Sequence, residues 1–362
     1  MTTVIRAANV NEALDKALNM VSSAIRAPES SEAQNWRKKA PRGMPTIERK
    51  GIVVTEYTKP MERVLFDAKR DANPFFHFFE ALWILDGRDD VGFLAQFNPN
   101  MLNFSDNGTT FHAPYGYRLR QHFERSSQFG HSMGPVDQLV EVIELLKREP
   151  DTRRAVMCIW DPSRDLNVQS KDLPCNDMVM FSINEENELE TEVVCRSNDV
   201  IWGAYGANAV QFSFLQEFVA RAVGVETGTL SQISRSFHFY LENETFKKLT
   251  EGRGYGGMLV DPYTWRGVEP YPLLNGDMDY KEWLEQLHDF LLEQCTVPSG
   301  IRYDAFFHEV AGPLYSSWVK WRCTDLSKNE RIVLAQQELV RCRAMDWRAA
   351  CHEWLERRRE VQ

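Results

Sequence analysis

The spacing of apolar residues changes along the chain, and this change is what most constrains its fold. Apolar and polar residues alternate over 154–160, 177–183 and 188–196, which predicts three strands, with the polar turn 184–187 between the last two. Residues 51–57 predict a further short strand, and 230–240 an extended segment. The polar stretch 28–49 is typical of a loop.

Helical spacing surrounds these strands. Asn73 followed by Pro74 is typical of a helix cap and first turn, and the helix is expected to end at Asp86-Gly87. Apolar residues recur at helical intervals over 136–147, over 211–223 and almost continuously from 280 to 362. The interleaved elements predict an α/β or α+β fold in a single core.

Composition excludes several classes of protein. The net charge of -10 is opposite to the basic surface that binding to nucleic acid requires, and no run of about 18 apolar residues could span a membrane. The seven cysteines form no Cys-x-x-Cys pair, so no metal site is expected. No secretory segment is recognised, and we expect reduced thiols and a cytoplasmic protein.

Cys175 is the best candidate for a nucleophile. It lies between Pro174 and Asn176, directly before a predicted strand, where active-site residues are often displayed. Taken alone, a cysteine is more often a small buried apolar residue. Its neighbours in the sequence therefore decide between the two interpretations.

Arginines and a hydroxyl group flank this thiol in the sequence. Arg153 and Arg154 open the strand before it, and Arg196-Ser197 ends the strand after it. Guanidinium groups and a serine hydroxyl suit phosphate oxygens, and positive charge near Cys175 is expected to lower the pKa of its thiol. The alternative is that these arginines form ordinary surface salt bridges.

Several motifs together resemble the thymidylate synthases and the related nucleotide hydroxymethylases over about residues 40–243. They are Pro174-Cys175, Arg196-Ser197-x-Asp199-x-x-x-Gly203, Asn208 and His238-x-Tyr240. The resemblance implies a large mixed β-sheet flanked by helices, here with a helical C-terminal segment added. It divides the chain into a catalytic core, 1–243, and a mostly helical extension, 244–362, packed on the same domain.

The resemblance also implies the chemistry. Cys175 would attack C6 of a pyrimidine deoxynucleoside monophosphate, and C5 would then take a one-carbon unit from 5,10-methylenetetrahydrofolate, without a metal. The phosphate would be held by Arg196, Ser197 and Arg42, helped by Arg153 and Arg154 of the second subunit of a homodimer. His238 and Tyr240 would meet the sugar hydroxyl and Asn208 the base. Asp199, Gly203 and Trp83 would contact the folate.

Two further residues match the family's proton-handling groups. Glu80 lies in 78–83, which resembles the family's His-Glu-Leu-Leu-Trp helix, and a carboxyl among aromatic residues should have a raised pKa. Tyr115 matches a tyrosine of the network that removes the C5 proton. Asn176 stands where the family's synthases have His beside the nucleophile, so it is also a catalytic candidate.

The sequence departs from the family pattern elsewhere. Ser236 replaces an aspartate, and one extra residue precedes Asn208. No Trp occurs between Phe93 and Pro114, although the methylating members have one there, and Phe104 is nearest to its place. Losing this shield would admit water, which favours hydroxymethylation over thymidylate synthesis.

The base remains open between uracil and cytosine. Asn208 suits dUMP, but the same amide turned by 180° would suit dCMP. Two other classes of protein are alternatives. One is a DNA cytosine-5 methyltransferase, which would need a glycine-rich cofactor loop, and the other is a helical interaction protein built on 280–362. The glycine cluster 252–257 joins no clear strand to a helix and is expected to be a flexible loop, and the tryptophans after 280 are expected to be helix core. A viral origin would place the enzyme in the host cytoplasm.

Overall fold

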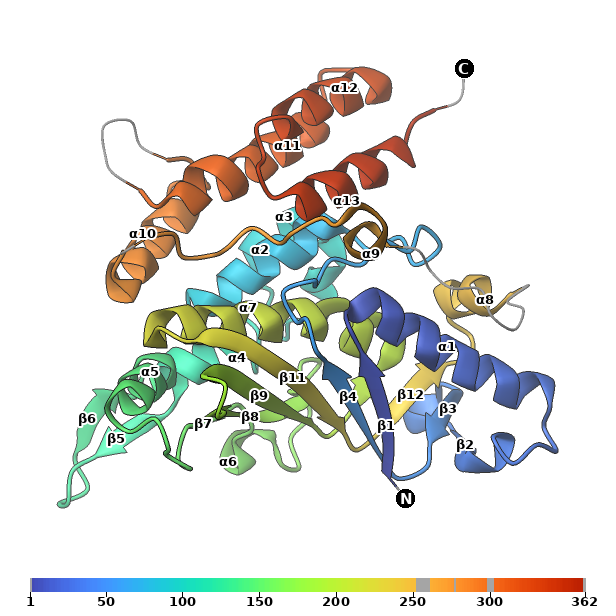
Figure 1. Ribbon diagram of the computed structural model, residues 1–362, viewed down its shortest axis with the longest axis horizontal. Coiled ribbons are helices and arrows are strands. Elements are labelled where there is room, and N and C mark those ends of the chain that lie inside the picture. Colours follow the sequence, from blue (N-terminus) through green and yellow to red (C-terminus); the bar gives the residue numbers. More distant parts are fainter. Residues whose placement is uncertain (1, 252–260, 277, 298–302, 361–362) are drawn as a thin grey trace.

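A mixed six-stranded sheet forms the centre of the molecule (Figure 1). The computed structural model describes residues 2–251, 261–276, 278–297 and 303–360, so the glycine cluster 252–257 lies outside it. The strands follow the order β1 (Thr2–Ala7), β4 (Ile52–Tyr57), β11 (Glu226–Ser234), β9 (Glu188–Cys195), β8 (Asn176–Ile183) and β7 (Val156–Cys158). β1 pairs with β4, and β9 with β11, in parallel, and the other pairs are antiparallel.

A second sheet carries part of the site. Its order is β10 (Asn198–Asp199), β12 (Phe237–Tyr240), β3 (Thr46–Arg49) and β2 (Trp36–Lys39). A hairpin of β5 (Glu124–Ser126) and β6 (Ser132–Pro135) stands apart from both sheets in Figure 1. The main sheet and its helices confirm the predicted mixed α/β fold.

Helices cover one face of the main sheet. α7 (Asn208–Val223) packs on β9 and β11, and α2 (Pro74–Leu85) packs on α7. The other helices of the first 251 residues are α1 (Val10–Arg26), α3 (Val91–Phe97), α4 (Tyr115–Tyr117), α5 (Gln138–Arg148), α6 (Pro162–Asp165) and α8 (Glu244–Thr250). Short 3-10 helices lie at Ala33–Asn35, Pro41–Gly43 and Pro99–Phe104, and π-helical turns at Arg118–His122, Val200–Ala207 and Phe307–Ala311.

The helix α2 is buried along its whole length, which explains its apolar sequence. The side chain of Asn73 accepts a hydrogen bond from the Phe76 amide, and Pro74 occupies the first turn, as predicted. Rings of the C-terminal helices pack against it: Phe75 lies 5.3 Å from Trp318, and Phe78 lies 5.1 Å from Trp347, between ring centroids.

The C-terminal helices close this side of the core. They are α9 (Pro262–Arg266), α10 (Tyr280–Leu292), α11 (Gly312–Arg322), α12 (Lys328–Leu339) and α13 (Met345–Glu356). α10, α11 and α13 all contact α2, and they form the uppermost layer of Figure 1. Within the described ranges, no helix is both long enough and apolar enough to cross a membrane.

One local prediction is wrong, one is confirmed but with a break in the segment, and one helix was not predicted. The stretch 28–49 is not all loop, because β2 and β3 lie within it and pair with each other, with β12 beyond β3. The extended segment 230–240 is two strands of different sheets, separated at Arg235 and Ser236. α1 was not predicted, although Asn9 caps it and one of its faces is buried.

Candidate active site

Cys175 opens into a cavity of about 510 Å³, within the range of small-molecule sites. It lies directly before β8, where the chain leaves a loop and enters the sheet. The same cavity is lined by most of the predicted phosphate- and sugar-binding residues: Arg42, Arg196, Ser197, His238 and Tyr240. Four segments far apart in sequence therefore meet at the thiol.

Arg196 holds the chain on both sides of Cys175. Its Nε donates to the carbonyl oxygen of Pro174 at 2.8 Å, and its backbone N–H donates to that of Cys175 at 3.0 Å. The Arg196 guanidinium lies 5.4 Å from the ring centroid of Trp160. The arginine is therefore positioned before any anion binds.

The prediction of a lowered thiol pKa is wrong for the free protein. Burial raises the pKa of Cys175, and Arg196, which opposes the rise, does not overcome it. Asp172 and Asp177 raise it further. The Cys175 thiol is thus protonated in the free protein at neutral pH.

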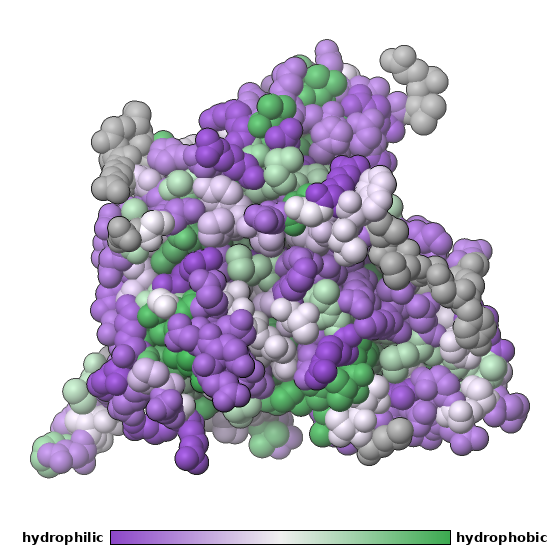
Figure 2. Space-filling view, in the orientation of Figure 1, coloured by the Kyte–Doolittle hydropathy of each residue, from purple (hydrophilic) through white to green (hydrophobic). Residues whose placement is uncertain are grey.

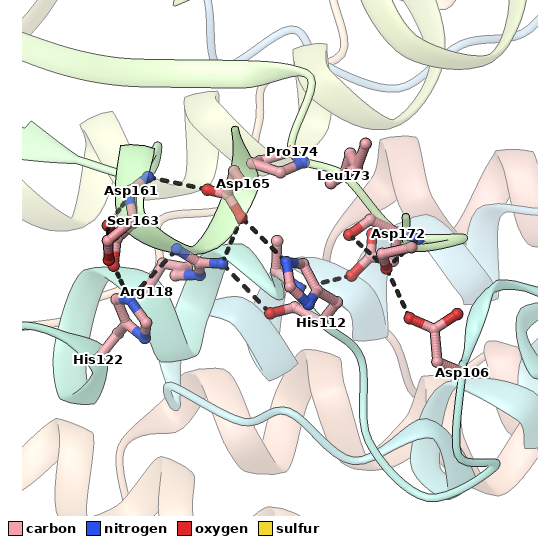
Figure 3. Close-up of polar contacts among 12 residues, drawn as sticks. Asp106, His112, Arg118, His122, Asp161, Ser163, Asp165, Asp172, Leu173 and Pro174 are labelled. Carbon is pink, nitrogen blue, oxygen red and sulfur yellow. Dashed lines mark hydrogen bonds and ion pairs between the residues drawn. The ribbon is translucent and has the colours of Figure 1, made fainter. Parts of the chain in front are cut away.

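The loop before Cys175 is fixed by a buried ion pair (Figure 3). Arg118, 1% exposed, donates from Nη2 to Oδ1 of Asp165 at 2.8 Å. His112 contacts the same carboxylate oxygen at 3.1 Å, and His122 lies 3.2 Å from Nη1 of Arg118. This cluster anchors α6, from which the chain runs to Pro174.

His238 and Tyr240 occupy one side of β12, as predicted from their spacing. Their ring centroids are 5.2 Å apart. Ser236, the residue that replaces an aspartate, donates its hydroxyl to Glu48 at 2.9 Å and lies 3.5 Å from Nδ1 of His238. Ser236 thus links the carboxylate of Glu48, on β3, to this histidine.

A second hollow adjoins the first, and Phe104, Tyr115 and Asp172 line both. Glu80 and Trp83, on α2, line the second hollow together with Asn208. Burial raises the pKa of Glu80 to about 7, as predicted, and the side chain of Gln211 opposes this rise. Oε2 of Glu80 and Oε1 of Gln211 are buried without a hydrogen-bond partner.

Tyr115 lines both hollows, with Glu80 in one and Cys175 in the other. Burial raises the pKa of its hydroxyl well above the usual range, and the charge of Cys175 adds to this rise. The next residue, Gly116, lies so close to α2 that a Cβ would be 2.3 Å from the carbonyl oxygen of Ile84. A glycine is therefore required where this segment crosses α2.

Asp199 lies near His238 behind the cavity. Its Oδ1 accepts a hydrogen bond from the Ile201 amide at 3.1 Å, so it caps the π-helical turns. Burial raises the pKa of Asp199, while the charges of His238 and Arg70 oppose the rise. Asp199 lines neither of the two hollows.

Arg153 and Arg154 are not brought to the cavity of their own chain. Both are exposed, and Arg154 donates to Glu149 at 2.5 Å. No group of three or more His, Cys, Asp or Glu side chains in the described ranges could hold a metal ion.

A family model described as Thymidylate synthase matches residues 66–252, about half of the chain. The chain is also 43% identical over 360 residues to the deoxyuridylate hydroxymethyltransferase of Pseudomonas phage M6, covering 98% of this chain and 94% of that one. The chain belongs to the thymidylate synthase family. It is therefore a one-carbon transferase.

Other members of the thymidylate synthase family are also similar. A deoxyuridylate hydroxymethyltransferase of Bacillus phage SP01 is 45% identical over 269 residues, 73% of this chain and 69% of that protein. A putative thymidylate synthase of Methanothermobacter marburgensis is 40% identical over 147 residues, 41% of this chain and 58% of that protein.

The segment before Asn208, where one extra residue is predicted, is not an ordinary α-helix. Residues Val200–Ala207 form π-helical turns, which take more residues per turn than an α-helix. A Cβ at Gly203, inside these turns, would lie 3.0 Å from Oδ1 of Asn198 and 3.6 Å from Nδ2 of Asn208. Gly203 thus leaves room for these two amides to meet.

Phe104, the residue nearest to the place of the family's missing Trp, is half exposed at the junction of the two hollows. Sequence reasoning missed Asp172, which lines both hollows and accepts a hydrogen bond from the Ala113 amide at 2.8 Å. It also missed Asn198, although this residue lies inside the motif from Arg196 to Asp199.

Proposed function

We propose that the enzyme hydroxymethylates dUMP, giving 5-hydroxymethyl-dUMP and tetrahydrofolate from dUMP, methylenetetrahydrofolate and water. One observation carries the proposal: Cys175 shares its cavity with Arg196, Ser197, His238 and Tyr240. A nucleophile, an anion site and a sugar site then lie within the reach of one nucleotide. The deoxyuridylate hydroxymethyltransferases of two phages, similar over most of this chain, support the same substrate.

Separate groups of residues bind the phosphate, bind the sugar and attack the base. Arg42, Arg196 and Ser197 bind the phosphate, and His238 and Tyr240 bind the sugar hydroxyl. The thiolate of Cys175 adds to C6, which moves the electron pair of the C5–C6 bond to C5. After C5 has taken the one-carbon unit, loss of its proton and departure of the thiolate restore the ring.

The hollow beside Cys175 suits the folate. Two buried oxygens in this hollow, on Glu80 and Gln211, have no hydrogen-bond partner and can accept hydrogen bonds from a ligand. Trp83 also lines the hollow. The folate supplies the methylene group. Glu80, with a pKa of about 7, can hold or release a proton beside that group, and the hydroxyl of Tyr115 interacts with Asn176 and with Cys175. Asp199 and Gly203 complete the folate side through the turns that precede Asn208.

Water, and not hydride, finishes the reaction in this proposal. Phe104 is half exposed where the family's methylating members place a buried Trp, so solvent reaches the exocyclic methylene. Hydroxide addition to this carbon gives the hydroxymethyl group and leaves the folate as tetrahydrofolate.

A homodimer completes the site. The face of the main sheet opposite α7 presents a row of apolar residues in register across five strands: Val4, Val54, Ile233, Val194 and Met178. Each is at least partly exposed, and Figure 2 shows hydrophobic surface along the lower side of the molecule, beneath the main sheet. A second copy would cover this row, and Arg153 and Arg154 would then reach the phosphate of the partner's site.

The remaining assignments follow from the same architecture. We propose residues 1–243 as the catalytic core and 244–362 as a helical extension on the same domain, because α10, α11 and α13 pack on α2. All seven cysteines are free, which supports a reducing cytoplasm, and relatives from phages suggest that of a host cell.

The test is to incubate the enzyme separately with dUMP and dCMP, each with methylenetetrahydrofolate, and to identify the product by mass spectrometry. A 5-hydroxymethyl nucleotide, oxygen-18 incorporation from labelled water and no dihydrofolate absorbance are expected with dUMP. A 5-methyl product with stoichiometric dihydrofolate would instead show thymidylate synthesis. Cys175→Ser serves as the inactive control.

A further inference from the structure

We propose that a chain of buried amides fixes the orientation of the Asn208 side chain and thereby makes the site accept uracil and reject cytosine. The amide chain consists of Gln232, Asn198, Asn208 and Asn176, and it rests on the proposed function in taking Asn208 as the base-reading residue. Gln232 and Asn198 would be positioning residues, remote from the nucleotide itself.

Four hydrogen bonds connect the amide chain. Gln232 Nε2 donates to the carbonyl oxygen of Ala204 at 3.1 Å, and Gln232 Oε1 accepts from Asn198 Nδ2 at 3.1 Å. Asn198 Oδ1 accepts from Asn208 Nδ2 at 3.1 Å. Asn208 Oδ1 in turn accepts from Asn176 Nδ2 at 3.2 Å. Each amide thus donates on one side and accepts on the other.

The direction of the chain is set by its first member. A backbone carbonyl can only accept, so the atom of Gln232 that faces Ala204 must be the nitrogen. Its oxygen then faces Asn198, which must present its nitrogen there and its oxygen to Asn208. Asn208 must therefore turn its nitrogen toward Asn198.

The other end imposes the same direction. Asn176 Oδ1 lies 2.8 Å from the sulfur of Cys195. Burial raises the pKa of this thiol well above its usual range, so the thiol keeps its proton and donates. A donor at Cys195 and an acceptor at Ala204 agree on a single arrangement of the four amides.

Burial makes the arrangement hard to reverse. Asn176 and Gln232 are 0% exposed, Asn198 is 1% and Asn208 is 5% exposed. Turning Asn208 by 180° would set its oxygen against the oxygen of Asn198 and its nitrogen against the nitrogen of Asn176. With little solvent to replace them, two buried hydrogen bonds would be lost.

The unused hydrogen-bonding capacity of Asn208 matches uracil. Its oxygen keeps one lone pair, which can accept from N3–H, and its nitrogen keeps one hydrogen, which can donate to O4. The 3.5 Å contact of this nitrogen to Asn176 Oδ1 is long enough for the base oxygen to replace it. Cytosine would oppose both groups, because its N3 accepts and its exocyclic amine donates.

The experiment compares Gln232→Met with Gln216→Met. Gln216 is a matched control: it is equally buried and its Nε2 also donates to backbone carbonyls, those of Leu189, Gly228 and Thr229, but it lies outside the amide chain. Calorimetry gives the Kd of dUMP and of dCMP for each protein. We expect Gln232→Met to lower the preference for dUMP by about tenfold, because the constraint that Asn198 places on Asn208 is lost and only the one from Asn176 remains, and Gln216→Met to retain it.

Gln232→Glu adds a readout that a packing role would not give. A carboxyl at this position, protonated or ionised, presents an oxygen to Asn198 as the amide does, so Asn198 must still turn its nitrogen toward it. The preference for dUMP should therefore be retained in Gln232→Glu at every pH, even though its carboxylate, once ionised, faces the carbonyl oxygen of Ala204 and lowers stability, whereas Gln232→Met loses the preference.

Two results would overturn the proposal. One is an unchanged Kd ratio in Gln232→Met, and the other is an equal loss in both methionine variants, which would mean that burial and not direction matters. Neither result depends on which product the enzyme forms. If the wild type made 5-methyl-dUMP, the proposed hydroxymethylation would be refuted, but the ratio of the Kd values for dUMP and dCMP would still test the amide chain.

Discussion

At the scale of single residues, the main finding is how burial sets protonation. Cys175 and Glu80 are both mostly neutral in the free protein below pH 7, and burial raises the pKa of each: it outweighs Arg196 at Cys175, and it acts on Glu80 in a hollow lined by aromatic residues. The state of Cys175 could not be predicted from the sequence near the thiol, where the arginines alone suggested a thiolate. The raised pKa of Glu80 was predictable because Trp83 and Ile84, one turn along the same helix, are among the residues that enclose it.

Replacing Cys175 by Ser should abolish turnover and spare binding. An alcohol is a far weaker nucleophile than a thiolate, so we expect kcat to fall by about 10³-fold or more, with the Kd of dUMP changed only a few-fold. Cys158→Ser is the control, since Cys158 is exposed on β7 and outside both hollows. A comparable loss in the control would remove Cys175 from its assigned role.

Glu80 should make stability depend on pH in a defined direction. Its pKa is raised to about 7 in the folded state from an ordinary 4.5, so the folded protein binds the proton more tightly. Its contribution is fully present below pH 4.5 and is lost as pH rises through 7. Relative to Glu80→Gln, the wild type should lose about 3 kcal/mol of unfolding free energy between pH 4.5 and 8.

Urea unfolding of both proteins at several pH values measures this difference. Groups that titrate alike in the two proteins cancel in the comparison. A difference that stays constant across the range would mean that Glu80 has an ordinary pKa.

At the scale of elements, the local sequence predicts some helices and strands, whereas others form only through tertiary pairing. α2 was predictable because Asn73 and Pro74 specify its start by themselves. The strands β2 and β3 were not, because their sequence is polar and they exist through pairing with each other and with β12. α1 could have been found, since Asn9 and the apolar spacing of 10–26 carry an ordinary helix signal.

The loop that carries Cys175 should depend on the pair of Arg118 and Asp165. Arg118→Met leaves Asp165 buried without its cation, and we expect the unfolding free energy to fall by about 3–5 kcal/mol. Arg118→Met with Asp165→Leu should recover much of this loss, because no charge is then left buried. Urea unfolding measures both, and a double variant no more stable than the single one would contradict this account.

At the scale of the whole molecule, the site is expected to span two copies of the chain. The family motifs predicted most residues that meet at Cys175, but Arg153 and Arg154 lie away from it in one chain. Asn198 was overlooked because its partners, Gln232 and Ser234, are more than thirty residues away in sequence.

Complementation tests the shared site. Cys175→Ser and a variant with Arg153→Ala and Arg154→Ala should each be nearly inactive. Mixed and allowed to exchange subunits, they should regain about a quarter of the wild-type sites, because half of the dimers then hold one intact site. No recovery, in a mixture shown by mass spectrometry to contain heterodimers, would mean that the arginines act within their own chain.

The packing of α2 also bears on how the protein is made. Phe75 and Phe78 belong to the helix that carries Glu80, yet they rest on Trp318, Trp347 and Trp354, which leave the ribosome more than two hundred residues later. During translation this apolar helix therefore remains without the aromatic residues that bury it in the folded protein. The core around α2 therefore cannot form until these tryptophans have been synthesised. In a chain that stalls before them, α2 stays exposed to chaperones and proteases.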